Sequence, residues 1–398
     1  MAAETGHIEH GDKKKVGFIN FISFLFGFSE ALLIYVLSDY FRQAIGFNNV
    51  SVFYFVSYAV ALVGLLNLHK LINKFGKATV FLFFFFLQIC FIALLIHVRP
   101  SLVGIILLIL YIIANYLALV MVDIILESYS EDKRSGRTRG LHLVIVNAGF
   151  ILGPFLSTTL LSRFGFDGLF MTSMIIYMVI FIIGLLGLRG VNHKFEQKLT
   201  VSDLMKKILV NGDIMKIYAI SFVLEFFYAL MVVYTPLYLL DRGLSWSQIG
   251  IVFTIMLIPF ISLEYFVGFL ADKRLGEKEM IIGGLLIVAI STASIFFITS
   301  NAVWIWASVL LVTRIGAATI EVLRDSYFYK KIDGRDMDII SFFRTAVSVA
   351  FITSTAISAL LLLVVPVKYT FLLVALVALL GLYPALNLVD NKSEIELE

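Results

Sequence analysis

The segment 123–137 reads DIILESYSEDKRSGR, and the segment 321–335, which begins 198 residues later, reads EVLRDSYFYKKIDGR. The two copies are identical at five of fifteen positions, and both carry acidic residues at the first and fifth positions. About one identity would be expected by chance from ordinary residue frequencies. The same offset places Ala31 and Leu32 on Ala229 and Leu230. The chain is therefore predicted to be built from two similar halves.

The composition of the chain is that of a membrane protein. Hydrophobic residues make up 60% of the 398 residues and charged residues 15%, whereas soluble domains contain about 45–50% apolar and about 25% charged residues. This composition excludes a disordered chain, a disulfide scaffold and a nucleic-acid-binding protein as the main class. The single cysteine, Cys90, cannot form a disulfide within the chain.

Twelve apolar runs in the sequence are long enough to cross a bilayer, which needs about 20 residues. Each run is predicted to be a helix, because backbone groups in lipid must be hydrogen-bonded within their own segment. The first run is too long for the core of a cleaved signal peptide and is predicted to be a membrane helix. The predicted spans are 16–41, 50–72, 78–98, 101–128, 140–163, 168–188, 214–240, 246–271, 279–299, 302–328, 338–365 and 368–388.

Basic residues define the predicted orientation, since cytoplasmic loops of membrane proteins are enriched in Lys and Arg. With the N-terminus inside, 25 of the 31 Lys and Arg residues lie on the inner side, five lie on the outer side, and Arg314 lies within a span. Both termini are therefore predicted to be cytoplasmic. We expect a multi-pass protein of the cell membrane, and specifically of a bacterial inner membrane.

The longest predicted inner connection divides the spans six and six. We expect an N-terminal six-helix bundle over residues 1–188, a cytoplasmic linker over 189–213, and a C-terminal six-helix bundle with a short tail over 214–398. The linker contains the amphipathic stretch 199–209, which is expected either to lie on the membrane surface or to be an ordinary solvated connection.

The loop that follows the span 246–271 reads GFLADKRLGEK over residues 268–278. It resembles the signature loop of the major facilitator superfamily, G-x-L-A-D-[RK]-x-G-x-[RK], with one extra residue. The matching positions are Gly268, Asp272, Lys273, Gly276 and Lys278.

The corresponding loop of the first half reads HKLINKFGK over residues 69–77 and is a degenerate copy. Asn73 stands where the family has Asp, and His69 stands where it has the first Gly. The retained positions are Lys74, Gly76 and Lys77. Because the acid is missing, the resemblance supports a gating role less strongly for this loop.

A third match lies at residues 149–154, which read GFILGP. Gly149, Gly153 and Pro154 resemble the G-x-x-x-G-P motif that the family carries mainly in exchangers. Gly-Pro pairs also kink helices for packing alone.

The resemblance covers nearly the whole chain and implies a fold of two pseudo-symmetric six-helix bundles with a substrate site near the bilayer midplane. It implies a secondary transporter that works by alternating access on a small-molecule substrate. Members of the family mostly work as monomers, and we expect the same of this chain.

Four charged residues lie well inside the predicted spans, near mid-membrane depth, where a charge costs on the order of 3 kcal/mol. They are Glu30, Glu225, Glu264 and Arg314. An Arg keeps its charge and needs a carboxylate or an anionic ligand beside it, so Glu225 or Glu264 is the expected partner of Arg314. Such a pair is either a fixed structural ion pair or a switchable pair at the central cavity, where a proton or a substrate anion competes for it.

Glu30 has no basic residue in its own span. A carboxyl group in such a position suits a proton carrier or a counter-charge for a cationic substrate. The resemblance points the same way, since proton-coupled multidrug exporters of this superfamily carry an acid in the first helix. The alternative is a neutral Glu30 that is hydrogen-bonded to Asn20 or to the backbone.

Two acidic pairs lie near the predicted inner face. Asp123 and Glu127 are four residues apart and share a helix face, and Glu321 and Asp325 repeat that arrangement. Asp123 and Glu321 lie one turn deeper than their neighbours and are alternative proton carriers.

The resemblance to the family assigns the remaining two acids to a cytoplasmic gate. Glu127 would pair with Lys74 or Lys77, and Asp325 would pair with Lys273, Arg274 or Lys278. These pairs would latch the cytoplasmic side while the transporter faces outward. The alternative is fixed anchoring of helix ends without switching.

Several kinds of site are missing from the sequence. There is no G-x-x-x-x-G-K-[ST] loop for ATP and no Cys/His cluster with metal-site spacing. We therefore expect no enzyme, no metal and no cofactor, with a proton gradient as the energy source.

Three functions stay open. We favour a proton antiporter that exports small amphipathic or cationic compounds. The alternative is proton-coupled uptake, or facilitated transport, of a small anionic or polar solute. A membrane scaffold or sensor without transport is the remote third. The expected partners are a small-molecule substrate, protons and the lipid bilayer, and no nucleic acid.

Overall fold

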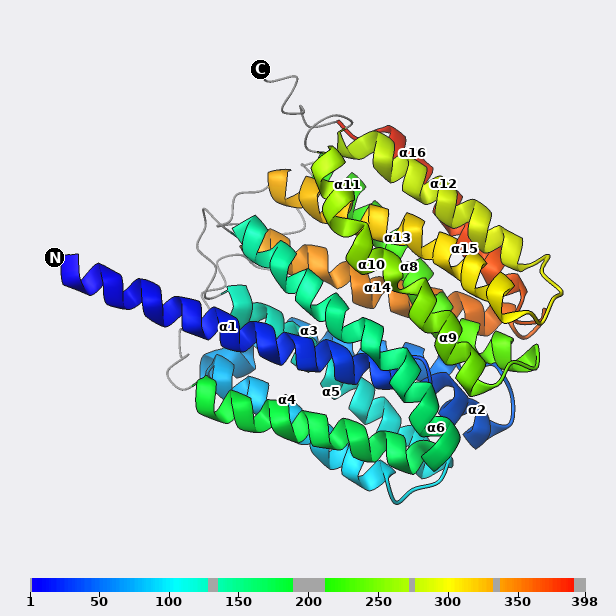
Figure 1. The fold of residues 1–398 in the computed structure, drawn as a ribbon, viewed down its shortest axis with the longest axis horizontal. Coiled ribbons are helices and arrows are strands. Elements are labelled where there is room, and N and C mark those ends of the chain that lie inside the picture. Colours follow the sequence, from blue (N-terminus) through cyan, green and yellow to red (C-terminus); the bar gives the residue numbers. More distant parts are fainter. Residues whose placement is uncertain (1, 128–134, 189–211, 272–275, 332–336, 390–398) are drawn as a thin grey trace. The chain divides into compact units, whose positions relative to one another are not determined.

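The computed structural model describes residues 2–127, 135–188, 212–271, 276–331 and 337–389 (Figure 1). Within these ranges every helix or strand that is assigned is an α-helix. Eleven helical segments of this part are long and apolar enough to cross a membrane. The prediction of an all-α membrane protein is therefore confirmed.

Two of the twelve predicted spans follow one another in a single helical segment that is kinked between them, which explains the count of eleven. The helix α6 (Ser135–Gly187) is 53 residues long and covers the predicted spans 140–163 and 168–188. Gly165 interrupts it with a non-helical φ of 66° and ψ of −164°. A positive φ is easily reached by glycine, so the chain turns between the two spans at this residue.

The chain forms two compact units, Met1–Ile34 with Val60–Glu196 and Tyr35–Ala59 with Gln197–Glu398. The first unit contains α1 (Ala2–Leu33), most of α3 (Ser51–Phe75), α4 (Lys77–Leu95), α5 (Leu102–Glu127) and α6. The second contains α2 (Leu37–Ile45), α8 (Gly212–Asp241), α9 (Trp246–Met256), α10 (Ile258–Ser262), α11 (Glu264–Leu270), α12 (Glu277–Ile295), α13 (Val303–Lys331), α14 (Met337–Leu361), α15 (Tyr369–Leu380) and α16 (Leu382–Leu386).

The placement of residues 35–59 distinguishes these units from the predicted halves. The bounds of the predicted bundles and their linker stay predictions, and residues 189–211 lie outside the described ranges.

The first unit is built around a close contact between α1 and α6, which lie side by side (Figure 1). A Cβ atom on Gly149 would collide with the backbone of Phe24 and Phe28, and one on Gly153 would collide with Ala31. The Ser157 hydroxyl donates a hydrogen bond of 2.5 Å to the carbonyl of Leu32. Small residues let membrane helices approach closely. Packing is therefore one role of the GFILGP motif, whose Pro154 is also buried.

The first predicted span is broken. We predicted one helix over 16–41, but α1 ends at Leu33, and Ile34–Val36 form a turn before α2. The amides of Asp39 and Tyr40 restart the hydrogen bonding on the carbonyl of Val36, at 3.1 and 3.2 Å. The β-branched Ile34 and Val36 and the aromatic Tyr35 are moderate helix formers, which makes a break here inexpensive.

The predicted span 246–271 is also divided, into α9, α10 and α11. Pro259 lies in the first turn of α10. Because proline has no N–H group and its ring clashes with the preceding turn, the helix cannot continue regularly through this residue.

Candidate functional site

Polar side chains collect around Glu30 inside the first unit. They come from three helices and form the Glu30 cluster, which consists of Ser29, Glu30, Tyr111, Asn115 and Tyr177. The Tyr111 and Tyr177 hydroxyls lie 2.7 Å apart, and Tyr177 donates a longer bond of 3.5 Å to Asn115 Oδ1. Tyr177 also interacts with the Ser29 hydroxyl and with the charge of Glu30. Tyr111, Tyr177 and Asn115 thus form a connected set of hydroxyl and amide groups near Glu30.

The Glu30 carboxyl group differs from its neighbours in exposure. Ser29 and Tyr177 are fully buried, whereas Glu30 is partly exposed. Among the described side chains, no ion pair is formed by Glu30, and no hydrogen bond joins it to Asn20. Asn20 is ten residues earlier in α1, which is roughly 15 Å along the helix. The alternative of an Asn20 partner is therefore wrong.

The second unit carries a denser set of charges on α8 and α13, the Arg324 cluster, which consists of Ser221, Glu225, Tyr228, Glu321, Arg324 and Asp325. Arg324 Nη1 donates hydrogen bonds of 2.8 Å to both Glu225 Oε1 and the Ser221 hydroxyl. Its Nε lies 3.2 Å from Asp325 Oδ1. Both Glu225 and Arg324 are buried, so this is an ion pair inside the second unit.

This ion pair corrects one sequence prediction. Arg314 was the expected partner of Glu225, but Arg324 takes that place. The two arginines are ten residues apart on α13, roughly 15 Å along the helix. Glu225 lies at the level of Arg324, and spacing within α8 and α13 alone does not fix how far one helix is shifted along the other.

Arg314 is 2% exposed and packs against aromatic rings. Its guanidinium carbon lies 4.8 Å from the ring centre of Phe227 and 5.6 Å from that of Tyr228. Aromatic faces attract a cation, which offsets part of the cost of burying it. Its Nη1 has no hydrogen-bond partner within the described part of the chain. The side chain of Glu264 lies outside the described residues, so the Arg314–Glu264 pair stays a prediction.

The two deeper acids of the repeat have different surroundings. The Tyr228 hydroxyl donates a 2.5 Å hydrogen bond to Glu321 Oε2, which connects Glu321 to the Arg324 cluster. Asp123, its counterpart in the first unit, is partly exposed near the end of α5. Proton binding by Glu321 or Asp123 stays a prediction.

The two predicted gate loops share one backbone feature. Gly76 precedes α4 with a φ of 83°, and Gly276 precedes α12 with a φ of 69°. Both residues cap a helix in the left-handed region that glycine adopts readily. The loop motif therefore has a structural reason for its glycine in both halves.

The predicted gate pairs are only partly described. Asp325 contacts Arg324 rather than a loop residue in the described part. Lys77 is buried, while Asn73 and Lys74 are exposed and Lys278 and Gly268 are partly exposed. Asp272, Lys273 and Arg274, with the side chain of Glu127, lie outside the described residues. The gating roles of all these residues stay predictions.

A different pair connects the second signature loop to α13. The buried carboxylate of Glu277 lies 2.6 Å from Lys330 Nζ and accepts a 3.2 Å hydrogen bond from Ser326. The sequence analysis missed Glu277 and Lys330, because it looked for an acid on the helix and a base in the loop. The sequence placed Arg324 among the charges near the inner face without a partner, and it gave no role to Tyr111 and Tyr177.

Comparisons with known proteins agree with this architecture. The sequence profile described as Major Facilitator Superfamily matches residues 19–336. No curated protein matches the chain. Among solved structures, the fold is similar to that of a protein described as the POT family transporter PepTSo, with a TM-score of 0.72 and 12% sequence identity over 94% of this chain and 97% of that one. At this identity the likeness concerns the fold alone, and it confirms the predicted fold class.

Proposed function

Since this chain belongs to the Major Facilitator Superfamily, we propose that it is a proton-coupled antiporter that exports small cationic or amphipathic compounds. The coarser part of this statement follows from the family: the chain is a multi-pass membrane transporter of a small molecule, and not an enzyme. The coupling ion, the direction of transport and the substrate class are the proposal. We also propose that the protein is a monomer in a bacterial inner membrane.

One observation carries the proposal, namely the contrast in exposure between Glu30 and Arg314. Glu30 is partly exposed and has no cationic partner among the described residues. Arg314 is 2% exposed and already packs on two aromatic rings. The charge that a solute can reach is therefore negative. An uncompensated carboxylate in a membrane interior is stabilised by a proton or by a cation.

Exchange follows if the two ligands exclude one another. One carboxyl group binds either a proton or a cationic substrate, so each ligand displaces the other at Glu30. Alternating access then carries the substrate in one direction and the proton in the other. The Tyr177 hydroxyl lies near Glu30 and hydrogen-bonds to the Tyr111 hydroxyl on α5.

The second candidate is uptake of a small anion, and Arg314 is the observation that favours it. Its Nη1 lacks a hydrogen-bond partner in the described part of the chain, and a buried donor without a partner costs stability unless a ligand or water satisfies it. We rank this reading second because the side chain is enclosed.

Purified protein in proteoliposomes separates the candidates. With an acidic lumen, an antiporter drives the cation ethidium inward, and with an acidic exterior, a symporter drives an anion such as benzoate inward. We expect ethidium uptake with an acidic lumen, and a loss of at least about tenfold in Glu30→Gln, which corresponds to about 1.4 kcal/mol. The matched control is Glu279→Gln on the exposed face of α12, which should transport normally.

Two results would reject the proposal. Ethidium uptake in Glu30→Gln at the parent rate would remove Glu30 from the coupling step. Benzoate uptake with an acidic exterior beyond that of protein-free vesicles, in the absence of ethidium exchange, would select the anion transporter. Replacing the proton gradient by a sodium gradient in the same vesicles identifies the coupling ion.

A further inference from the structure

We propose that the connection between α14 and α15 is inserted into the membrane surface, and that Lys368 at its end binds the phosphate of a phospholipid. This connection, the apolar turn, reads LLVVPVK over residues 362–368. The predicted orientation of the chain places it at the outer leaflet. The inference goes beyond the proposed function, since it concerns neither the solute nor the coupling ion, and its test needs neither.

The apolar turn exposes large hydrophobic side chains. Leu363 is 74% exposed and Val364 is 85% exposed, the largest value among the large hydrophobic residues of the described part of the chain. Such exposed apolar surface is typical of contact with lipid or with another protein. The corresponding connection of the first half, 198 residues earlier, reads FGFDGLF and carries the charge of Asp167. The apolar turn is therefore particular to the second half.

The backbone of the apolar turn needs little water. The amides of residues 362–365 all donate to carbonyls of the last turns of α14, at distances of 3.0 to 3.2 Å. Pro366, the next residue, has no amide hydrogen. The carbonyls of Pro366 and Val367 accept hydrogen bonds from the amides of Tyr369 and Thr370. Backbone groups must be satisfied within the protein where lipid replaces water, and this turn meets that condition.

The helix after the apolar turn is short for a membrane. The span Tyr369–Leu386 has 18 residues, the fewest among the eleven candidate spans of the described ranges. At 1.5 Å per residue it is about 27 Å long, whereas the hydrocarbon core is about 30 Å thick. Residues that flank such a short span lie at the border of the apolar layer. The side chains of Leu363 and Val364 suit that position.

Lys368 places a cation at the end of the apolar turn. Its Nζ lies 4.8 Å from the ring centre of Phe296 and 5.6 Å from that of Tyr369, and these two rings are 5.1 Å apart. No salt bridge joins Lys368 to an acid within the described residues. Contacts with ring faces hold the amine in place without using a hydrogen-bond acceptor. At a membrane surface the acceptor of opposite charge is a lipid phosphate.

Two further aromatic side chains lie beside this cation. Phe297 follows Phe296, and Trp304 begins the first turn of α13. Both are strongly exposed. Trp side chains are enriched at the border between lipid and water, where the ring is apolar and the N–H group contacts headgroups. The exposed rings and the Lys368 amine therefore fit a lipid surface better than they fit water.

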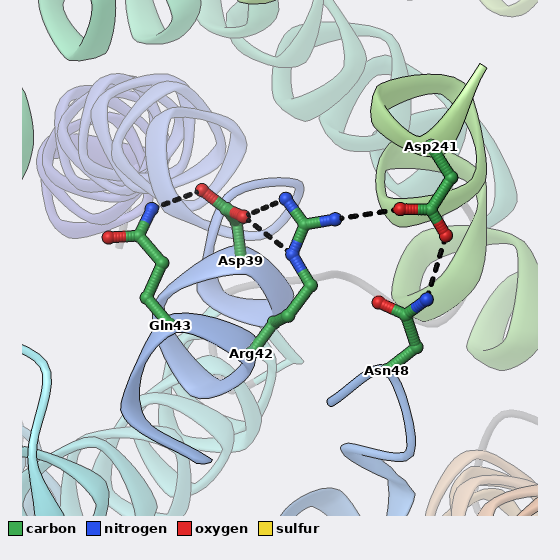
Figure 2. A network of polar contacts seen from close by, with 5 residues as sticks. All are labelled: Asp39, Arg42, Gln43, Asn48 and Asp241. Carbon is green, nitrogen blue, oxygen red and sulfur yellow. Dashed lines mark hydrogen bonds and ion pairs between the residues drawn. The ribbon is translucent and has the colours of Figure 1, made fainter. Parts of the chain in front are cut away.

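A neighbouring connection of the second unit has the opposite character. Tyr238 near the end of α8 contacts Phe371 of α15, with ring centres 5.1 Å apart, so both helices have these ends together. Beyond Tyr238, Asp241 Oδ1 lies 3.1 Å from Arg42 Nη1, and Arg42 Nη2 lies 2.6 Å from Asp39 Oδ1 (Figure 2). The end of α8 thus carries charges that suit water, and the apolar turn is a distinct surface beside it.

Fluorescence quenching at a single label tests the insertion. In a Cys90→Ser background, Val364→Cys carries an NBD fluorophore, and the full-length protein is placed in nanodiscs of phosphatidylcholine and phosphatidylglycerol. The quenchers are phosphatidylglycerol with a nitroxide near the top of one acyl chain, and iodide in the water. We expect the ratio of nitroxide to iodide quenching to be at least about fivefold higher at Val364→Cys than at Asp167→Cys, the matched control in the first half.

A second variant tests the phosphate. In detergent, the protein labelled at Val364→Cys is titrated with the same nitroxide phosphatidylglycerol. Lys368→Gln should raise the concentration for half-quenching about fivefold, because one Lys near the lipid surface is lost. Lys216→Gln at the other end of the unit is the matched control and should leave that concentration unchanged. Diacylglycerol with the same nitroxide has no phosphate, and it should quench the parent and Lys368→Gln alike.

Each outcome decides the proposal. Equal ratios at Val364→Cys and Asp167→Cys place the apolar turn in water and overturn the insertion. A label at residue 364 that neither quencher reaches shows that a second copy or another protein covers the turn, which also overturns it. Equal half-quenching concentrations in Lys368→Gln and the parent overturn the phosphate contact. If Val364→Cys is recovered poorly, Leu363→Cys gives the same test, since its side chain is also exposed.

Discussion

The two units treat buried charge in different ways. In the first, Glu30 lies near the Tyr177 hydroxyl and has no cationic partner in the described part. In the second, Glu225, Glu321 and Asp325 are grouped around Arg324, with Arg314 enclosed by rings nearby. The offset of 198 residues places Tyr228 opposite Glu30 and Leu126 opposite Arg324. The two halves thus share their helices and the acids at 123/321 and 127/325, but they differ in the charges at 30/228 and 126/324.

This difference indicates a division of labour. Arg324 compensates the charges of the acids around it and also holds their side chains in place. The charges of the second unit therefore have a structural role first. In the proposed function, Glu30 of the first unit is left for a ligand. The following three predictions test that contrast, from the largest expected effect to the smallest.

Removing the central cation of the second unit should have the largest effect on stability. Arg324→Ala leaves Glu225 buried and unpaired, which should lower the free energy of unfolding by about 3–5 kcal/mol. Unfolding in mixed SDS and detergent micelles measures the change. The double variant Arg324→Ala with Glu225→Ala should recover part of the loss. If Arg324→Ala is as stable as the parent, the Arg324–Glu225 pair does not offset the cost of burying Glu225.

In the first unit, an added methyl group should lower the free energy of unfolding more than a change of charge does. Gly153→Ala would press against Ala31 of α1 and should cost about 1–3 kcal/mol. Gly283→Ala is the matched control in α12, because no atom lies within 4 Å of its added Cβ. The same SDS titration measures both variants. If the two behave alike, the close approach of α1 and α6 is not a source of stability.

The smallest effect should come from single hydroxyls. Tyr228→Phe removes the hydrogen bond to Glu321 and should cost about 1.5 kcal/mol, because one partner of a buried group is lost. Tyr218→Phe removes a part-buried bond to Thr345 and should cost about 0.5 kcal/mol. A reversed order of the two midpoints of unfolding would mean that Glu321 does not depend on Tyr228.

Much of the fold could be predicted from the sequence. Apolar runs of sufficient length give the spans, because lipid leaves the backbone no alternative to helix, and the copies at 123–137 and 321–335 indicate the repeat. The break at Ile34–Val36 was missed, since no Gly or Pro marks it. The separation of the spans 140–163 and 168–188 was predicted, and the non-helical dihedral angles of Gly165 mark it.

The candidate site was predicted in its members and not in its pairs. Charges inside apolar runs are conspicuous, so Glu30, Glu225 and Arg314 were found. Which guanidinium meets Glu225 depends on how α8 and α13 are shifted along each other, and that shift is set by packing over their whole length. The contacts of Arg42 with Asp39 and Asp241 were missed because these residues lie at the ends of spans, where charges are ordinary.

The contact of Gly149 and Gly153 with α1 has a consequence for how any solute is accommodated at Glu30. The backbones of α1 and α6 leave no space for a methyl group between them, so we expect the two helices to move together and not separately. A larger solute at Glu30 would then have to displace α1 and α6 together. Size selection at this position would then be a property of the whole unit and would resist change by single substitutions around the acid.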